Sequence, residues 1–214
     1  MGLLLVLSLG PAAGAAEAFA VTPQLLSRVE KQYGEYAKRR VARWGEILRT
    51  DRQQPESRKL VIVNNFFNQL PFLPDQRHWG QTDYWATPLE FLETDGGDCE
   101  DFALAKYFTL RELGVPAERL RLTYVKSLTL DQAHMVVTYY KRPGAEPLVL
   151  DNLDGQIKRA SLRPDLLPVY SFNGEGLWLA KQRGLGRFVG SANRLSLWQG
   201  LKRRMRAEGL ELAH

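Results

Sequence analysis

The chain has 214 residues, of which 44% are hydrophobic, 10% aromatic and 25% charged. This composition excludes disordered, collagen-like and low-complexity proteins, and the length suits one domain with a substantial core. The 29 Lys and Arg exceed the 24 Asp and Glu, so the net charge of +5 mildly favours acidic partners. The only cysteine, Cys99, excludes an internal disulfide and a thiolate-rich zinc or iron–sulfur site. Cys99 is therefore either a small core residue or a lone reactive thiol.

Residues 1–16 carry no charged side chain and combine an apolar run with a small-residue stretch. The apolar run is shorter than the roughly 20 residues that span a bilayer, and it is typical of a secretory signal peptide. The usual basic start is missing, since the first basic residue is Arg28. The alternative is an apolar helix packed on the domain. We expect residues 1–18 to be a cleaved signal peptide, residues 19–214 to form one domain, and the protein to be periplasmic.

The first half of the chain has helical periodicity. Apolar residues recur at three- and four-residue steps over residues 25–48, after Thr22 as N-cap and Pro23 at the first helical position. A second helix is expected over residues 56–69. An ordered aromatic loop, residues 70–87, and a short helix, residues 89–93, follow.

The segment Asp95-Gly-Gly-Asp-Cys-Glu-Asp101 precedes a predicted helix over residues 99–113. Asp98 occupies the N-cap and Asp101 lies three residues later, a variant of the capping box. Cys99 therefore falls in the first helical turn. There, unpaired N–H groups and the helix dipole stabilise a thiolate and an oxyanion, and we expect a lowered thiol pKa.

Three strand-like runs follow, over residues 120–128, 134–141 and 147–153. Helices followed by strands predict an α+β fold, with the Cys99 helix packed on an antiparallel sheet and helices at both ends of the chain.

The last two strands are predicted to form a hairpin. Residues 142–145 have Pro and Gly at the central positions of a type II turn. Pairing the turn's ends places Asp151 opposite Val136. His134 and Asp151 then share one face as diagonal neighbours, within reach of one hydrogen bond. Because an imidazole accepts a thiol proton and a carboxylate orients the imidazole, Cys99, His134 and Asp151 form a candidate catalytic triad.

Several segments together resemble the bacterial transglutaminase-like cysteine proteinases, most specifically Gly-Gly-Asp-Cys-Glu-Asp. The similarity spans residues 21–179 and includes TPLEFL at 87–92, GGDCEDFA at 96–103, LTYV at 122–125, AHMV at 133–136 and LVLDNL at 148–153. It implies a papain-like, transglutaminase-type core. Cys99 is then the nucleophile, His134 the general base and acid, and Asp151 the orienting carboxylate.

The resemblance also implies calcium dependence, with Asp98 and Glu100 as ligands and Asp101 beside them. Carboxylate oxygens suit Ca²⁺. From the residues alone, however, acids in a first helical turn are equally explained by capping and the helix dipole. Asp95 is a weaker candidate ligand.

The resemblance further implies a substrate and a regulator. The substrate is a large repeat adhesin (LapA-like), cut near its N-terminus at an Ala-Ala site to promote biofilm dispersal. The inhibitor is an inner-membrane cyclic-di-GMP receptor (LapD-like). An exposed aromatic residue is needed for such docking, and Trp79 and Trp85 are the candidates. Trp85 and Asn65 are candidates for a further oxyanion donor.

Residues 181–206 carry eight Lys or Arg and no acidic residue. With Trp198 and Met205 interleaved, they indicate an amphipathic helix with a solvated basic face. Contact with an anionic membrane or nucleic acid is the alternative, and export argues against nucleic acid.

Two other functions of the protein stay open, a transglutaminase-like acyltransferase and a non-catalytic receptor- or adhesin-binding module.

Overall fold

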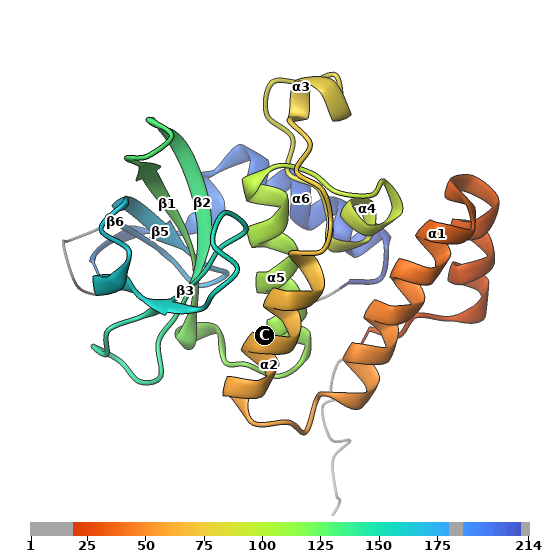
Figure 1. Ribbon diagram of the computed structural model, residues 1–214, viewed down its shortest axis with the longest axis horizontal. Coiled ribbons are helices and arrows are strands. Elements are labelled where there is room, and N and C mark those ends of the chain that lie inside the picture. Colours follow the sequence, from red (N-terminus) through yellow and green to blue (C-terminus); the bar gives the residue numbers. More distant parts are fainter. Residues whose placement is uncertain (1–18, 180–185, 211–214) are drawn as a thin grey trace, which may run out of the picture.

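The computed structural model describes residues 19–179 and 186–210 (Figure 1). The predicted signal peptide, residues 1–18, lies outside the described residues, as does the start of the basic tail at residues 181–185. Among the described residues, no helix combines the length and apolar character needed to cross a bilayer.

The α-helices follow the predicted order, with one addition inside the aromatic loop. They are α1 (Pro23–Thr50), α2 (Glu56–Phe67), α3 (Asp75–His78), α4 (Pro88–Glu93), α5 (Cys99–Glu112) and α6 (Ser196–Ala207). The Thr22 hydroxyl accepts the Leu25 N–H at 3.1 Å, which confirms the predicted start of α1. Gly34, with φ +86°, kinks this helix, because only glycine adopts that conformation without steric cost.

The strands form one antiparallel sheet in the order β4-β3-β2-β1-β5-β6-β7. They are β1 (Leu120–Ser127), β2 (Gln132–Tyr139), β3 (Leu148–Leu150), β4 (Lys158–Arg159), β5 (Leu166–Phe172), β6 (Leu177–Leu179) and β7 (Arg187–Gly190). The first three strands correspond to the predicted runs. The sequence did not indicate the last four.

The predicted β2–β3 hairpin is confirmed. The Ala145 N–H donates to the Arg142 carbonyl at 3.1 Å, and Gly144 has φ +76°, as a type II turn requires. Val137 pairs with Leu150, so the same register puts Val136 opposite Asp151.

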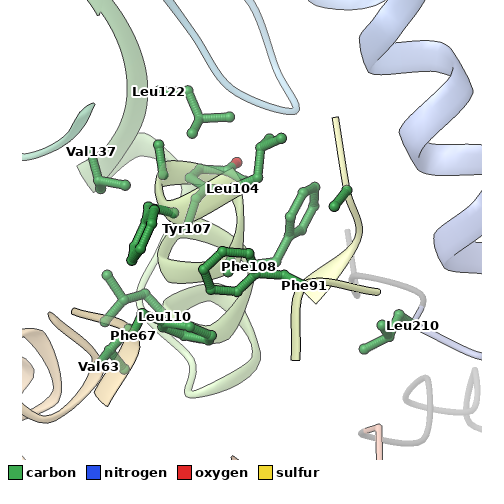
Figure 2. Close-up of a cluster of buried hydrophobic side chains, with 14 of the residues drawn as sticks. Val63, Phe67, Phe91, Leu104, Tyr107, Phe108, Leu110, Leu122, Val137 and Leu210 are labelled. Atoms are coloured by element: carbon green, nitrogen blue, oxygen red, sulfur yellow. The ribbon is translucent and has the colours of Figure 1, made fainter. Parts of the chain in front are cut away.

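Helix α5 runs through the centre of the molecule, between the sheet and the other helices (Figure 1). Figure 2 shows Leu122 and Val137 of the sheet on one side of α5, with Val63 and Phe67 of α2 on the other. All four side chains are fully buried. Burying each large apolar side chain contributes about 1.5–3 kcal/mol, so packing fixes the position of α5 and therefore of Cys99.

Helix α6 is amphipathic, as predicted, and its apolar face closes the core. The Trp198 ring stacks on Phe108 with centroids 5.5 Å apart and meets Phe172 edge-on at 5.4 Å. From its polar face, the Arg204 Nε donates to Glu90 at 3.1 Å, and its guanidinium also binds the Trp85 carbonyl. Helix α6 thereby holds α4 and the loop that precedes α4.

Candidate active site

Two glycines shape the chain immediately before α5. A Cβ atom on Gly96 would lie 2.3 Å from the Pro71 carbonyl oxygen, and φ of Gly96 is +129°. A Cβ atom on Gly97 would lie 2.1 Å from Oδ2 of Asp101. The Gly97 carbonyl accepts the Leu73 N–H at 2.8 Å. Only glycines allow this close approach, which sets where α5 begins.

Asp101 is fully buried and binds backbone N–H groups on both sides of the site. Its Oδ1 accepts the Ala86 N–H at 2.7 Å, and its Oδ2 accepts the Asp98 N–H at 3.3 Å. The second contact belongs to the predicted capping box. These bonds confirm the predicted capping role of Asp101, and a carboxylate oxygen of Asp101 also lies within 4.8 Å of oxygens of Asp75 and Asp98.

Cys99 is half-buried in the first turn of α5, and its thiol donates to Oε2 of Glu100 at 2.8 Å. Burial, followed by the nearby carboxylates of Glu100 and Asp98, raises the pKa of the Cys99 thiol. The lowered pKa expected from the helix dipole alone was therefore wrong for this arrangement of residues. A hydrogen bond from the Met135 backbone acts in the opposite direction and places the sulfur against the strand that carries His134.

His134 and Asp151 form a buried hydrogen-bonded pair, as the hairpin register predicts. The His134 Nε2–H donates to Oδ1 of Asp151 at 2.7 Å, and both side chains are almost completely buried. The same oxygen accepts the Leu153 N–H at 3.0 Å. Burial alone would raise the pKa of Asp151, but the contacts with His134, Leu153 and Arg163 lower it to about 2. Asp151 is therefore a carboxylate at neutral pH, and the Nδ1 atom of His134 is left for a reacting group.

Two further residues hold Asp151. The Arg163 Nη2 donates to Oδ2 of Asp151 at 2.7 Å. The side chain of Asn68, the C-cap residue of α2, donates to the Asp151 backbone carbonyl at 2.8 Å. The sequence indicated neither residue, because each lies in a segment without a recognisable motif.

Asn65 and Trp85 are the candidates for a further oxyanion donor, and the first is exposed whereas the second is buried. Asn65 lies exposed on α2. The Trp85 side chain hydrogen-bonds to Asp83, and its ring stacks on Phe172 with centroids 5.6 Å apart. The structure therefore does not assign this role to Trp85. Trp85 is only 6% exposed, so it lacks the exposure expected of a docking anchor. Trp79 is half-buried against Tyr84.

An acidic cluster adjoins Cys99 and consists of Asp75, Asp83, Asp98 and Glu100. Within this cluster, carboxylate oxygens of Asp75, Asp83 and Glu100 lie within 4.8 Å of one another, and Asp98 lies equally close to Glu100. Asp75 and Asp83 were not indicated by the sequence, since they lie in the loop well before the Gly-Gly-Asp-Cys block. Asp95 lies outside the cluster, because its exposed carboxylate pairs with Arg40 at 2.9 Å.

The donor set of the acidic cluster fits a hard divalent cation. The Oδ1 atoms of Asp75 and Asp98 are buried without a hydrogen-bond partner, although buried polar atoms are normally satisfied. Burial, together with the neighbouring carboxylates, raises the pKa of Asp75 to about 6 and that of Asp98 to about 10. A cation ligated by these oxygens satisfies the unpaired atoms and offsets the repulsion.

The Cys99 thiol lies at the start of a buried helix, beside the strand whose His134 is hydrogen-bonded to Asp151. This arrangement defines the class of thiol-dependent hydrolases and acyltransferases. Residues 32–164 match the bacterial transglutaminase-like cysteine proteinase (BTLCP) family. Because the match covers more than half of the chain, the protein belongs to this family.

Solved structures of Legionella pneumophila LapG are similar to this chain. The EGTA-treated form is 45% identical with a TM-score of 0.76, and the match covers 87% of this chain and 98% of that one. The calcium-bound form is 45% identical with a TM-score of 0.74, over 86% and 99% of the two chains. A search of curated proteins finds no match. The predicted fold class and family are confirmed.

Proposed function

We propose that this protein is a calcium-dependent cysteine endopeptidase of the LapG type. It acts in the periplasm, cleaving a large LapA-like surface adhesin near its N-terminus at an Ala-Ala site and so promoting biofilm dispersal. The observation that carries the peptidase proposal is the buried hydrogen bond of Asp151 to His134, which lies on the strand against which Cys99 packs. The 45% identity to LapG supports the finer assignment of substrate and compartment.

The proposed reaction has two steps, formation of a thioester on Cys99 and its hydrolysis. His134 accepts the Cys99 thiol proton as Sγ attacks the scissile carbonyl carbon, and Asp151 stabilises the imidazolium. Backbone N–H groups in the first turn of α5 stabilise the oxyanion. The C–N bond then breaks, the leaving amine takes the proton from His134, and a thioester on Cys99 remains. Water, deprotonated by His134, hydrolyses the thioester and restores the thiol.

We assign calcium binding to Asp75, Asp83, Asp98 and Glu100, with Asp101 as a further ligand that also binds the backbone of the loop. A bound Ca²⁺ supplies positive charge beside Cys99. This charge offsets the carboxylates that raise the pKa of the Cys99 thiol. The calcium-bound structure of Legionella pneumophila LapG supports this assignment.

Regulation follows from the same similarity. We propose that a LapD-like inner-membrane receptor sequesters the protease when cytoplasmic cyclic-di-GMP is high. Of the two tryptophans considered, Trp79 is the remaining candidate for contact with the receptor, since Trp85 is buried in the core.

The test is cleavage of an adhesin N-terminal fragment by the wild type and by Cys99→Ala, each with calcium and with chelator. We expect cleavage only by the wild type with calcium. Cleavage by Cys99→Ala would exclude the mechanism, and cleavage by the wild type in chelator would exclude calcium dependence. An aminated or cross-linked product would indicate an acyltransferase. Adhesin binding without any product would indicate a binding module.

A further inference from the structure

We propose that Arg163 is a positioning residue for the candidate triad, acting through the carboxylate of Asp151 and itself held by Asp165. This inference rests on the proposed function, because it assigns Asp151 the role of orienting His134. Arg163 and Asp165 extend the His134–Asp151 pair into a continuous chain of hydrogen bonds.

The two oxygens of the Asp151 carboxylate have separate partners. Oδ1 accepts N–H bonds from His134 at 2.7 Å and Leu153 at 3.0 Å, whereas Oδ2 accepts Nη2 of Arg163 at 2.7 Å. Asp151 is 1% exposed and Arg163 6% exposed, so water does not readily replace a lost partner. Rotation of the carboxylate therefore breaks three hydrogen bonds, and Arg163 fixes the oxygen that faces away from His134.

Asp165 in turn fixes the guanidinium. Its Oδ1 lies 3.0 Å from Nε of Arg163, and its Oδ2 lies 2.8 Å from Nη2. This two-point contact uses the planar fork of arginine, which a lysine ammonium does not reproduce. Nη2 thus bridges the two carboxylates.

The Arg163 guanidinium offsets part of the negative charge of the two carboxylates that it bridges. Asp151, Arg163 and Asp165 together carry one net negative charge, because Asp151 and Asp165 ionise readily beside the guanidinium. When His134 takes the thiol proton, the four residues become neutral as a unit. Arg163 therefore limits the negative charge facing His134 while keeping Asp151 ionised and oriented.

The test compares Arg163→Met, Arg163→Lys and Asp165→Asn with the wild type in the calcium-loaded protein. We expect Arg163→Met to lower kcat on the order of tenfold to a hundredfold, with KM within about twofold, as for other residues that orient a reacting group. Arg163→Lys should recover part of the loss, and Asp165→Asn should lose less than Arg163→Met. Arg119→Met is the control, because it removes another arginine–carboxylate contact, with Glu56 at 2.8 Å, away from His134.

A substrate-independent readout is the ¹⁵N chemical shifts of His134, which report the fraction of imidazole carrying its proton on Nε2. This fraction should fall in Arg163→Met and stay at the wild-type value in Arg119→Met. An unchanged tautomer, with kcat per folded protein within twofold of the wild type, would overturn the inference. If Arg163→Met does not fold, the same readouts on Arg163→Lys and Asp165→Asn decide. If the wild type cuts no adhesin but Arg163→Met still lowers the Nε2-protonated fraction of His134, the proposed substrate is refuted and the role of Arg163 is intact.

Discussion

The Cys99 thiol and the Glu100 carboxylate, on adjacent residues, form a hydrogen bond of 2.8 Å. The same carboxylate lies within 4.8 Å of oxygens of Asp75 and Asp83. Glu100 therefore connects the proposed nucleophile directly with the proposed calcium site. Any ion that draws the Glu100 carboxylate into its coordination shell changes the electrostatic surroundings of the thiol.

Glu100→Gln should weaken calcium binding on the order of tenfold to a hundredfold, since an amide oxygen carries no formal charge. Isothermal titration with CaCl₂ measures this directly. Asp95→Asn is the matched control from the loop before α5, because Asp95 pairs with Arg40 and its substitution should leave the affinity within twofold. Equal affinities of Glu100→Gln and the wild type would remove Glu100 from the ligand set.

Calcium should raise the melting temperature of the wild type. A ligand that binds only the folded state stabilises it by about 2.7 kcal/mol at a concentration 100 times the Kd. Scanning calorimetry with calcium and with EGTA measures the shift. The shift should shrink in Asp75→Asn, where one oxygen of the proposed site is replaced, and persist in Asp95→Asn. A shift that Asp75→Asn leaves unchanged would place the ion elsewhere.

Gly97→Ala should destabilise the protein by about 1–3 kcal/mol and lower activity, because the new Cβ atom would lie 2.1 Å from Oδ2 of Asp101. The clash displaces the carboxylate that joins the start of α5 to Ala86. Chemical denaturation and peptidase assays measure the two effects. Gly174→Ala is the control, since no atom lies within 4 Å of its added Cβ. Wild-type stability of Gly97→Ala would show that the close contact relaxes without cost.

Lys106 should make stability depend on pH above neutrality. Burial lowers the pKa of Lys106 from 10.5 to about 7, against the opposing charge of Asp151. The folded protein therefore loses this proton at a lower pH than the unfolded chain, and stability rises as pH increases from about 7 to 10. Lys106→Met should be more stable than the wild type at pH 6 by roughly 1–4 kcal/mol, since an apolar side chain avoids the cost of burying charge.

Urea unfolding of Lys106→Met and the wild type between pH 6 and 9 checks this difference. The advantage of the variant should narrow as pH rises. Lys31→Met, on the exposed face of α1, should follow the wild type at every pH. A variant less stable than the wild type at pH 6 would mean that the electrostatic attraction between Lys106 and Asp151 outweighs the cost of burying Lys106.

Local interactions made much of the site predictable from sequence. The capping pattern around Asp98 and Asp101 placed Cys99 in the first turn of α5, and the Pro-Gly turn set the register that joins His134 to Asp151. Both features depend on residues close in sequence, whose geometry is decided by turn and capping chemistry. Strand β5 escaped prediction because Pro168 interrupts its pattern and its pairing with β1 contains a bulge.

The sequence by itself determined the helix that carries Cys99, the hairpin that carries His134 and Asp151, and the family. Only the tertiary structure decided that Asp75 and Asp83 join Glu100, that Arg163 holds Asp151, and that Trp85 is buried. These outcomes depend on contacts between residues far apart in the chain. Such contacts form only when the loops pack around α5, and no local propensity encodes them.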